Sequence, residues 1–332
     1  MALSAPISSW ILANAERLDL RATQLSWVDD WVPDIFDFAV EITVDGVVYE
    51  GRGTADSEDL AFAKAGAEAL ERAAVATTDA KSSNGFAVHP DMRQACRLAT
   101  QELLERDAYF CHWLARTPFI ALPDSSWDKL QIGRSSITSI AARLQALGID
   151  LAHALMRTAD GSPAVVCVAR GARSARPFGV IQGLGIGQIE EALCKATLEC
   201  LRTTVAWSSG NYKGGAPLGW HAFALVPSPG PLEHERLGLA LESMFTMGRY
   251  LALSTGGNTT PGAAPAVQCT QVKLPAEIAD APVVAVRAVS THLQDAVFGH
   301  AIEIDINLQR LSQFAGRSIT PADLCLDPHF FG

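Results

Sequence analysis

A charged pattern that occurs twice, E-x-x-E-R, constrains this chain more than any other feature of its sequence. The first copy is Glu68, Glu71 and Arg72, and the second copy is Glu102, Glu105 and Arg106. Each copy lies in a stretch of helical periodicity, so its three side chains share one face of a helix. A single copy is ordinary on a solvated helix surface, because an arginine there neutralises two glutamates.

The surroundings of the two copies favour burial over a solvated surface. Both copies lie among Ala, Leu and Phe residues, with few other polar positions nearby. Burial of both would concentrate four carboxylates, which repel one another and raise one another's pKa unless cations lie between them. Four inward carboxylates on two helices indicate a site of hard oxygen ligands, which suits Mg²⁺ bound together with water and phosphates.

The periodicity along the chain predicts an α/β fold, with α+β-like mixed sheets packed by long helices. We expect helices over 58–78, 91–116, 137–147, 189–207 and 232–253, and strands in a hairpin over 36–50, in a pair over 153–170 and over 282–289. Turn-forming residues predict a linker over 81–90, a tight strand-to-helix turn over 183–187, and loops over 208–231 and 254–265, the last of them mobile. No charge run or low-complexity segment marks a boundary, so we expect one domain over 1–332.

Composition excludes some classes of function. The 332 residues include 26 basic and 36 acidic side chains, for a net charge of −10. The chain therefore lacks the basic surplus that binding to nucleic acid or anionic membranes requires, which leaves small molecules and peptides as ligands. No apolar run has the length of a membrane span or a signal peptide, and the seven cysteines show no disulfide or zinc pattern. We therefore expect a reduced, cytoplasmic protein.

Three segments together resemble the YcaO family in their order, their spacing and the residues they contain. They are GRGTADSEDLAFAKAGAEALERA, SSNGFAVHPDMRQACRLATQELLERDAYFCHWL and GLGIGQIEEALCKATLE, within residues 51–203. In that family the two E-x-x-E-R helices hold Mg²⁺ and ATP, and the S-N-G loop belongs to the nucleotide pocket. The resemblance therefore implies an ATP- and Mg²⁺-dependent enzyme that acts on a peptide backbone amide, with its ATP- and Mg²⁺-binding core over about 51–203.

The resemblance also implies roles for individual residues. The implied metal ligands are Glu68, Glu71, Glu102 and Glu105, and the implied phosphate neighbours are Arg72 and Arg106. Ser83 and Asn84 become nucleotide contacts, and Arg52 becomes a phosphate candidate.

Two positions depart from the family pattern. Ala65, with Lys64 beside it, stands in place of a serine, and Arg202 stands where a glutamine is usual, three residues after Glu199. One hydroxyl contact to the nucleotide is therefore missing or replaced. Arg202 can pair with phosphate or with Glu199, so we count Lys64, Glu199 and Arg202 as candidate nucleotide-binding residues.

The implied reaction is the cyclodehydration of a ribosomally made peptide natural product. A Cys, Ser or Thr side chain attacks the preceding carbonyl, the oxyanion takes the γ-phosphoryl group of ATP, and loss of phosphate leaves a thiazoline or oxazoline. Metal ions, Arg72 and Arg106 would neutralise the charge of this step. For the base we predict the C-terminal carboxylate of Gly332, with His329 as the alternative, although the ending DPHFFG departs from the proline-rich tail of azoline-forming members.

The resemblance implies partners as well as a reaction. Because 332 residues leave little room for a leader-peptide-binding domain, we expect a precursor peptide as substrate and a partner subunit that resembles ubiquitin-activating enzymes and binds the leader. A flavin-dependent dehydrogenase can complete such a complex by oxidising the azoline to an azole.

Three alternatives stay open. The same activation could lead to a thioamide, with an external sulfur donor, or to a macroamidine. A non-catalytic subunit could instead keep the fold in order to bind a peptide or a partner, which Ala65 and Arg202 favour. The four glutamates and two arginines favour catalysis, because burying them without a ligand would cost their mutual repulsion.

Overall fold

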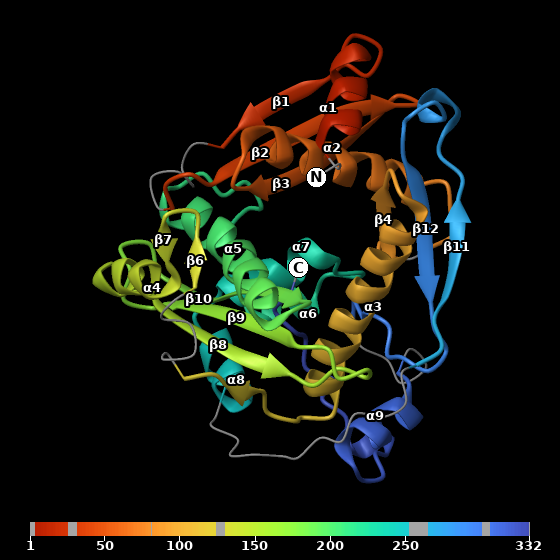
Figure 1. Cartoon of the computed structure of the whole chain (residues 1–332). Helices are drawn as coiled ribbons and strands as arrows, with labels where there is room; N and C mark the ends of the chain where they lie inside the picture. Colours follow the sequence, from red (N-terminus) through yellow and green to blue (C-terminus); the bar gives the residue numbers. More distant parts are fainter. Residues whose placement is uncertain are drawn as a thin grey trace. The chain divides into compact units, whose positions relative to one another are not determined.

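The computed structural model describes residues 4–25, 32–80, 82–123, 130–251, 265–300 and 306–331. The chain divides into two compact units. Unit 1 comprises 1–103, 132–134 and 266–290, and unit 2 comprises 104–131, 135–265 and 291–332. Both units combine helices with small sheets, which confirms the predicted mixed α/β fold class (Figure 1). The expectation of one domain over 1–332 stays a prediction.

Unit 1 consists of two three-stranded antiparallel sheets, ordered β1-β2-β3 and β11-β12-β4, that share one hydrophobic core with the helices. Its elements are α1 (Ser4–Ala13), β1 (Arg21–Gln24), β2 (Phe36–Val44), β3 (Val47–Ala55), α2 (Glu58–Val75), β4 (Phe86–His89), β11 (Gln268–Val272), the short helix Ala276–Ile278 and β12 (Val284–Val289). The core includes Ile11 of α1, Val40 of β2, Leu70 of α2 and Val88 of β4.

The β2–β3 hairpin forms where the sequence predicts it. Alternate residues of β2 are buried, and the strands turn at Asp45 and Gly46, whose φ angles are 50° and 77°. Two positive φ angles in a two-residue turn match the right-handed twist of the flanking strands. The local sequence therefore determines this part of unit 1.

Unit 2 is built around a four-stranded antiparallel sheet of order β10-β9-β8-β5. Its elements are β5 (Ile120–Ala121), β7 (Ser135–Ser136), α4 (Ile137–Ala146), β8 (Asp150–Met156), β9 (Ala164–Gly171), β10 (Phe178–Ile186), α5 (Ile189–Ser208), α6 (Trp220–Ala224), α7 (Pro231–Leu239), α8 (Ser243–Tyr250), α9 (Leu308–Ala315) and the short helix Pro321–Asp323. Helix α5 packs against β9 and β10, and α7 and α8 also contact β10. Every residue of β10 is buried as a result.

Two elements include residues of both units. Helix α3 (Met92–Leu114) begins in unit 1 and ends in unit 2, and the short strand β6 (Gln131–Ile132) also includes residues of both. Each E-x-x-E-R copy lies on one of the predicted helices, the first on α2 and the second on α3.

Four sequence predictions need correction. The linker 81–90 contains strand β4, which forms because it pairs with β12 and because Phe86 and Val88 enter the core. The glycines of 183–187 lie mainly in β10 rather than in a turn. The predicted helix over 232–253 is two helices, α7 and α8, separated at an extended Ala240. The predicted loop over 208–231 contains α6, whereas the predicted loop over 254–265 falls almost entirely outside the described residues.

Within the described residues, no helix is both long enough and apolar enough to cross a lipid bilayer.

Candidate functional site

The first strand–helix module, residues 51–72, brings β3 and α2 into backbone contact. Gly51 and Gly53 face the helix, and a Cβ added at either position would overlap the backbone of α2. This approach lets a helix side chain reach the strand, because the backbone N–H of Arg52 donates to Glu68 Oε2 at 2.9 Å. Glu68 Oε1 accepts from Arg72 Nη2 at 2.7 Å, one helical turn away. The first E-x-x-E-R copy is thus fixed to the sheet through Glu68.

Three of the predicted metal ligands interact within unit 1. The pKa of Glu71 is raised well above its ordinary value by burial, and then by the negative charges of Glu102 and Glu68. Arg72 lowers it, but less than these effects raise it. An acid destabilised by its neighbours in this way gains most from a cation placed beside it.

The other candidates of unit 1 have partners of their own. The Arg52 guanidinium pairs with the fully buried Asp37 at 2.9 Å, and Lys64 Nζ donates to the Thr54 carbonyl at 3.1 Å. Asn84 is buried and Ser83 is exposed, in the turn that leads into β4. The structure therefore gives Arg52 a role in joining the strands of the hairpin, and it leaves nucleotide contact by Ser83 and Asn84 a prediction.

The second strand–helix module, residues 183–202, repeats this arrangement in unit 2. Gly183 and Gly185 of β10 face α5, where an added Cβ would overlap the helix backbone. The backbone N–H of Leu184, between the two glycines, donates to Glu199 Oε2 at 2.7 Å. Arg202 is half-buried on the same helix.

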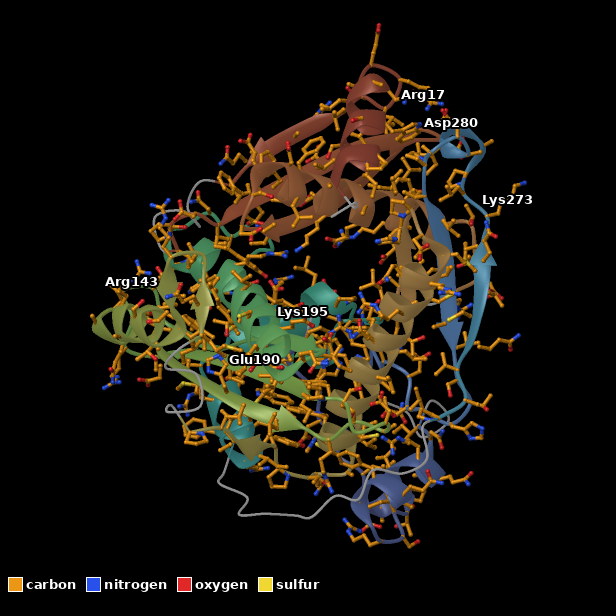
Figure 2. The ribbon with its side chains drawn as sticks, in the orientation of Figure 1. Arg17, Arg143, Glu190, Lys195, Lys273 and Asp280 are labelled. Carbon is orange, nitrogen blue, oxygen red and sulfur yellow. The ribbon has the colours of Figure 1, made fainter. Side chains whose placement is uncertain are left out.

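The second E-x-x-E-R copy places a buried carboxylate in unit 2. Glu105 is only 1% exposed, and its Oε2 accepts from Lys195 Nζ of α5 at 2.9 Å (Lys195 is labelled in Figure 2). Arg106 Nη1 lies 3.6 Å from Glu105 Oε1. Burial by itself would lower the pKa of Lys195, but the charges of Glu105 and Glu199 and the hydrogen bond raise it above its ordinary value. Glu105 therefore has two cations beside it, whereas two further carboxylates raise the pKa of Glu71.

Lys195 is a residue beside the second E-x-x-E-R copy that the sequence analysis did not single out. A signal for it was present, because the helix of each module reads K-A-x-x-E-x-L, over 64–70 and 195–201. The repeat makes Lys195 the counterpart of Lys64 and Glu199 the counterpart of Glu68. It also makes Arg202 the counterpart of Glu71, so the second module carries a cation where the first carries an anion.

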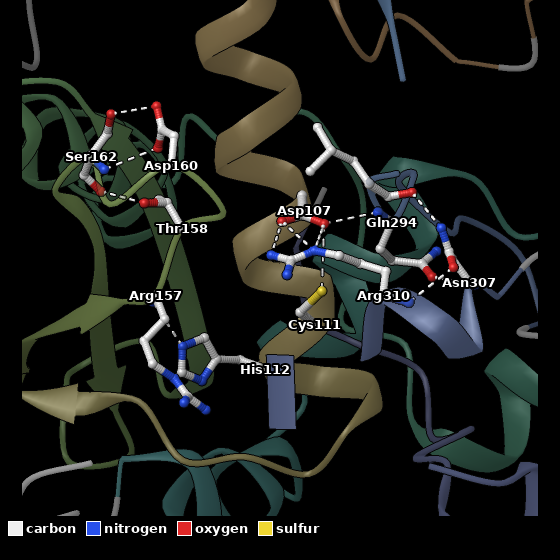
Figure 3. Close-up of polar contacts among 11 residues, drawn as sticks. Asp107, Cys111, His112, Arg157, Thr158, Asp160, Ser162, Gln294, Asn307 and Arg310 are labelled. Atoms are coloured by element: carbon white, nitrogen blue, oxygen red, sulfur yellow. Dashed lines mark hydrogen bonds and ion pairs between the residues drawn. The ribbon is translucent and has the colours of Figure 1, made fainter. Parts of the chain in front are cut away.

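Helix α3 is anchored just beyond Arg106 by a buried ion pair. The Asp107 carboxylate accepts from Arg310 Nη2 of α9 at 2.6 Å, from the Gln294 backbone N–H at 2.8 Å, and from the Cys111 thiol (Figure 3). The Cys111 thiol has a raised pKa because of burial and the nearby Asp107 charge. This network holds the end of the chain to α3, with Cys111 as a packing element.

The C-terminal segment packs beside Arg106. The Arg106 guanidinium lies 4.1 Å above the Phe331 ring. His329, the alternative base, is buried, with Nε2 donating to the Val297 carbonyl at 2.8 Å and Nδ1 accepting from the Phe331 N–H at 3.2 Å. Both ring nitrogens are thus engaged, which disfavours His329 as a base. Gly332, the predicted base, lies outside the described residues.

The carboxylates of the candidate site suit a magnesium ion, although they do not form a ready-made set of metal ligands within the described residues. Within the described ranges, no three His, Cys, Asp or Glu side chains form a cluster ready to hold a metal ion. Mg²⁺ does not require one, because it usually binds through one or two carboxylates together with waters and substrate phosphates. The raised pKa of Glu71 beside Glu102 and Glu68 is the observation that fits a cation. In the structure Arg72 pairs with Glu68 and Lys195 pairs with Glu105, and the role of these carboxylates as metal ligands stays a prediction.

Solved structures with a similar fold exist. A structure of YcaO from Methanopyrus kandleri bound with AMPPCP and Mg²⁺ has 16% sequence identity and a TM-score of 0.59, and the match covers 89% of this chain and 93% of that one. A heterocyclase in complex with substrate and cofactor has 10% identity and a TM-score of 0.64, with 98% of this chain and 57% of that one covered. This chain therefore spans less than two thirds of the heterocyclase. At these identities the likeness shows the fold.

Sequence comparison identifies the family. No curated protein sequence matches the chain. The family model described as YcaO cyclodehydratase, ATP- and Mg²⁺-binding, matches residues 72–246, which is more than half of the chain. This chain therefore belongs to the YcaO family of ATP- and Mg²⁺-binding cyclodehydratases.

Proposed function

We propose that this protein is an ATP-dependent enzyme that activates a backbone amide of a peptide and forms a thiazoline or oxazoline from a Cys, Ser or Thr residue. The observation that carries the proposal is the raised pKa of Glu71 in unit 1, which burial causes first and the Glu102 and Glu68 carboxylates increase. A protein that only needed the fold would gain stability by replacing such an acid. Membership of a family of cyclodehydratases supports the same conclusion.

Individual residues have separable roles in this proposal. Glu68, Glu71 and Glu102 hold the cation together with Glu105, and Arg72 and Arg106 neutralise the phosphates. ATP supplies the γ-phosphoryl group, which the amide oxygen takes and releases as phosphate, so the peptide loses one water as ATP becomes ADP and phosphate. The side chain that attacks the carbonyl gives its proton to a base, for which the Gly332 carboxylate remains our prediction.

The proposed substrate is a precursor peptide presented by a partner subunit. The match to a heterocyclase in complex with substrate and cofactor supports a substrate in which a heterocycle is formed. We further propose that a separate subunit, similar to ubiquitin-activating enzymes, binds the leader peptide. A flavin-dependent dehydrogenase would act afterwards on the azoline.

Thermal unfolding with Mg²⁺ alone, ATP alone and both tests the proposed site. A ligand at 100 times its dissociation constant adds about 2.7 kcal/mol to stability, so the midpoint should rise clearly when both are present. The rise should vanish in Glu68→Gln and Glu105→Gln and persist in the control Glu190→Gln, an exposed residue of α5 (Figure 2). A rise that both site variants retain would contradict the proposed ligands.

The mass of the peptide product tests the proposed reaction. Loss of one water indicates cyclodehydration, whereas exchange of oxygen for sulfur would indicate thioamide formation. An amidine between the N-terminus and a backbone amide also loses water, but it blocks the N-terminal amine. If the complete complex binds Mg²⁺ and ATP and modifies no peptide, the chain is a binding subunit.

A further inference from the structure

Two cysteines of unit 1 lie against one another where α3 meets β11. Cys96 is on the second turn of α3, and Cys269 is on β11, 173 residues later in the sequence. The Cys269 thiol donates to the Cys96 carbonyl at 3.8 Å, and its sulfur lies 3.7 Å from the hydroxyl of Thr100, one helical turn further along α3. Cys269 Sγ therefore lies over the turn of α3 that begins at Cys96.

The side chains of these two cysteines are also in direct contact. The Cys96 thiol donates a hydrogen bond to Cys269, and its pKa is raised by burial first and then by this hydrogen bond. Both residues are free thiols in this structure, and both are half-buried. A small oxidant can therefore reach two sulfur atoms that the fold has already brought together.

A second pair of thiols, in unit 2, has the same contact without the solvent access. The Cys167 thiol of β9 forms a hydrogen bond with the Cys200 thiol of α5. Both of these side chains are 0% exposed, so an oxidant in solution does not reach them while the protein is folded. The two pairs share the proximity of their sulfur atoms and differ in exposure.

The strand that carries Cys269 can accommodate a covalent bond. A disulfide brings its sulfur atoms to about 2 Å from one another, closer than hydrogen-bonded thiols, so one element must shift toward the other. Strand β11 lies at the edge of its three-stranded sheet, beside β12 (Figure 1). Its residues Gln268, Thr270 and Gln271 are exposed, so a small shift of this strand disturbs little of the core.

We propose that Cys96 and Cys269 are a site of reversible oxidative modification, at which hydrogen peroxide converts the two thiols into a disulfide that ties α3 to β11. One thiolate attacks a peroxide oxygen and becomes a sulfenic acid, as the O–O bond breaks and the other oxygen leaves as water. The second thiolate attacks the sulfenic sulfur, which forms the S–S bond and releases the remaining oxygen as water. Two thiols and one peroxide thus give one disulfide and two waters, and a dithiol reverses the change.

Peptide mapping of the wild-type chain tests the proposal without any substitution. The folded protein is treated with hydrogen peroxide, its remaining thiols are alkylated, and it is digested with trypsin without reduction. Cys96 falls in the tryptic peptide 94–97 and Cys269 in the peptide 250–273. Mass spectrometry should find these two peptides joined, at their summed mass less two hydrogens, and separated again after dithiothreitol. Persistence of both thiols, or their conversion to sulfinic acids without a cross-link, would overturn the proposal.

The buried thiol pair is the internal control of the same digest. Cys167 and Cys200 fall in the tryptic peptides 158–170 and 196–202, which should stay separate. A cross-link of equal yield between these two peptides would contradict the argument from exposure. The experiment contains neither ATP nor Mg²⁺, so its result does not depend on the proposed function.

Thermal unfolding measures whether the native fold accepts the bond. The disulfide would close a loop of 173 residues, so the oxidised wild type should unfold about 5 °C above the reduced protein. Cys96→Ser should lose both the cross-link and this rise, whereas Cys194→Ser, at a half-buried cysteine of α5, should keep both. An oxidised wild type that unfolds at or below the midpoint of the reduced protein would overturn the proposal. Because this criterion uses the wild type, it holds even if Cys96→Ser is unstable.

Discussion

The two strand–helix modules have the same backbone arrangement and different electrostatics. Each has a glycine on either side of the strand residue whose N–H donates to a glutamate of the helix, at 2.9 Å in the first module and 2.7 Å in the second. Three residues after that glutamate the first module has Glu71 and the second has Arg202. At this one position the first module therefore carries an anion and the second carries a cation.

The partners on α3 extend this difference. Glu102 adds to the negative charge that raises the pKa of Glu71, whereas Glu105 is balanced by Lys195. The comparison teaches that repeated backbone geometry can serve two tasks. In our proposal the carboxylates of the first module attract the cation.

The largest expected effect compares the buried ion pairs of the two units. Asp107→Ala should cost about 3–5 kcal/mol, because it leaves the Arg310 charge buried without its partner. Asp37→Ala in unit 1 should cost less, since Arg52 is 25% exposed and can turn toward water, whereas Arg310 is 9% exposed. Urea unfolding of both variants measures the difference. Equal losses would show that burial of the arginine does not set the cost.

A second test asks whether the two modules are equivalent in packing. Gly51→Ala and Gly183→Ala should each destabilise the protein by roughly 2–3 kcal/mol, because the added methyl group overlaps a helix backbone. Gly248→Ala, with open space around its Cβ and a helical position in α8, should be neutral or slightly stabilising. Thermal unfolding of the three variants provides the comparison. A tolerated change in only one module would break the equivalence.

A fall in pH should change the stability of the two units in opposite directions. Burial lowers the pKa of His112 in unit 2 to about 3, so the stability it contributes is present above the unfolded value of 6.5 and is lost as pH falls toward the folded value. Between about pH 7 and about pH 5 this loss should reach about 2 kcal/mol. The pKa of Glu71 is raised, so its contribution is greatest below the unfolded value of 4.5 and is lost as pH rises through its folded pKa.

Hydrogen exchange resolved by peptide measures these two responses separately. On acidification, amides at the C-terminal end of α3 and in α9 should exchange faster relative to the intrinsic rate at each pH, and those of α2 should not. His112→Gln should remove most of the response of unit 2. Uniform acceleration in both units would contradict the assignment of opposite signs.

The smallest expected effect concerns the carboxylates themselves. In the absence of metal, Glu71→Gln should raise the unfolding midpoint by about 2 °C, because it relieves repulsion among like charges. Glu105→Gln should lower stability by roughly 1–2 kcal/mol, because Lys195 loses a charged partner. Differential scanning calorimetry in a metal-chelating buffer measures both. A change of the same sign in both variants would remove the electrostatic contrast between the two halves.

The sequence by itself determined the elements and the family. Periodicity predicted the hairpin of β2 and β3 and the helices α2, α3, α4 and α5, because their hydrophobic patterns and turn residues are local signals. The repeated E-x-x-E-R pattern with its flanking segments identified the YcaO family, which the family model confirms. It also predicted that the glutamates are metal ligands, which the unfolding experiments with Mg²⁺ and ATP test.

Only the tertiary structure decided which charges balance which. Strand β4 forms in a segment of turn residues because β12 pairs with it, and Gly183 belongs to a strand because α5 packs onto it. Lys195 meets Glu105 across 90 residues of sequence. Such pairings depend on long-range packing and on burial, which set the strength of an electrostatic interaction and which no local pattern encodes.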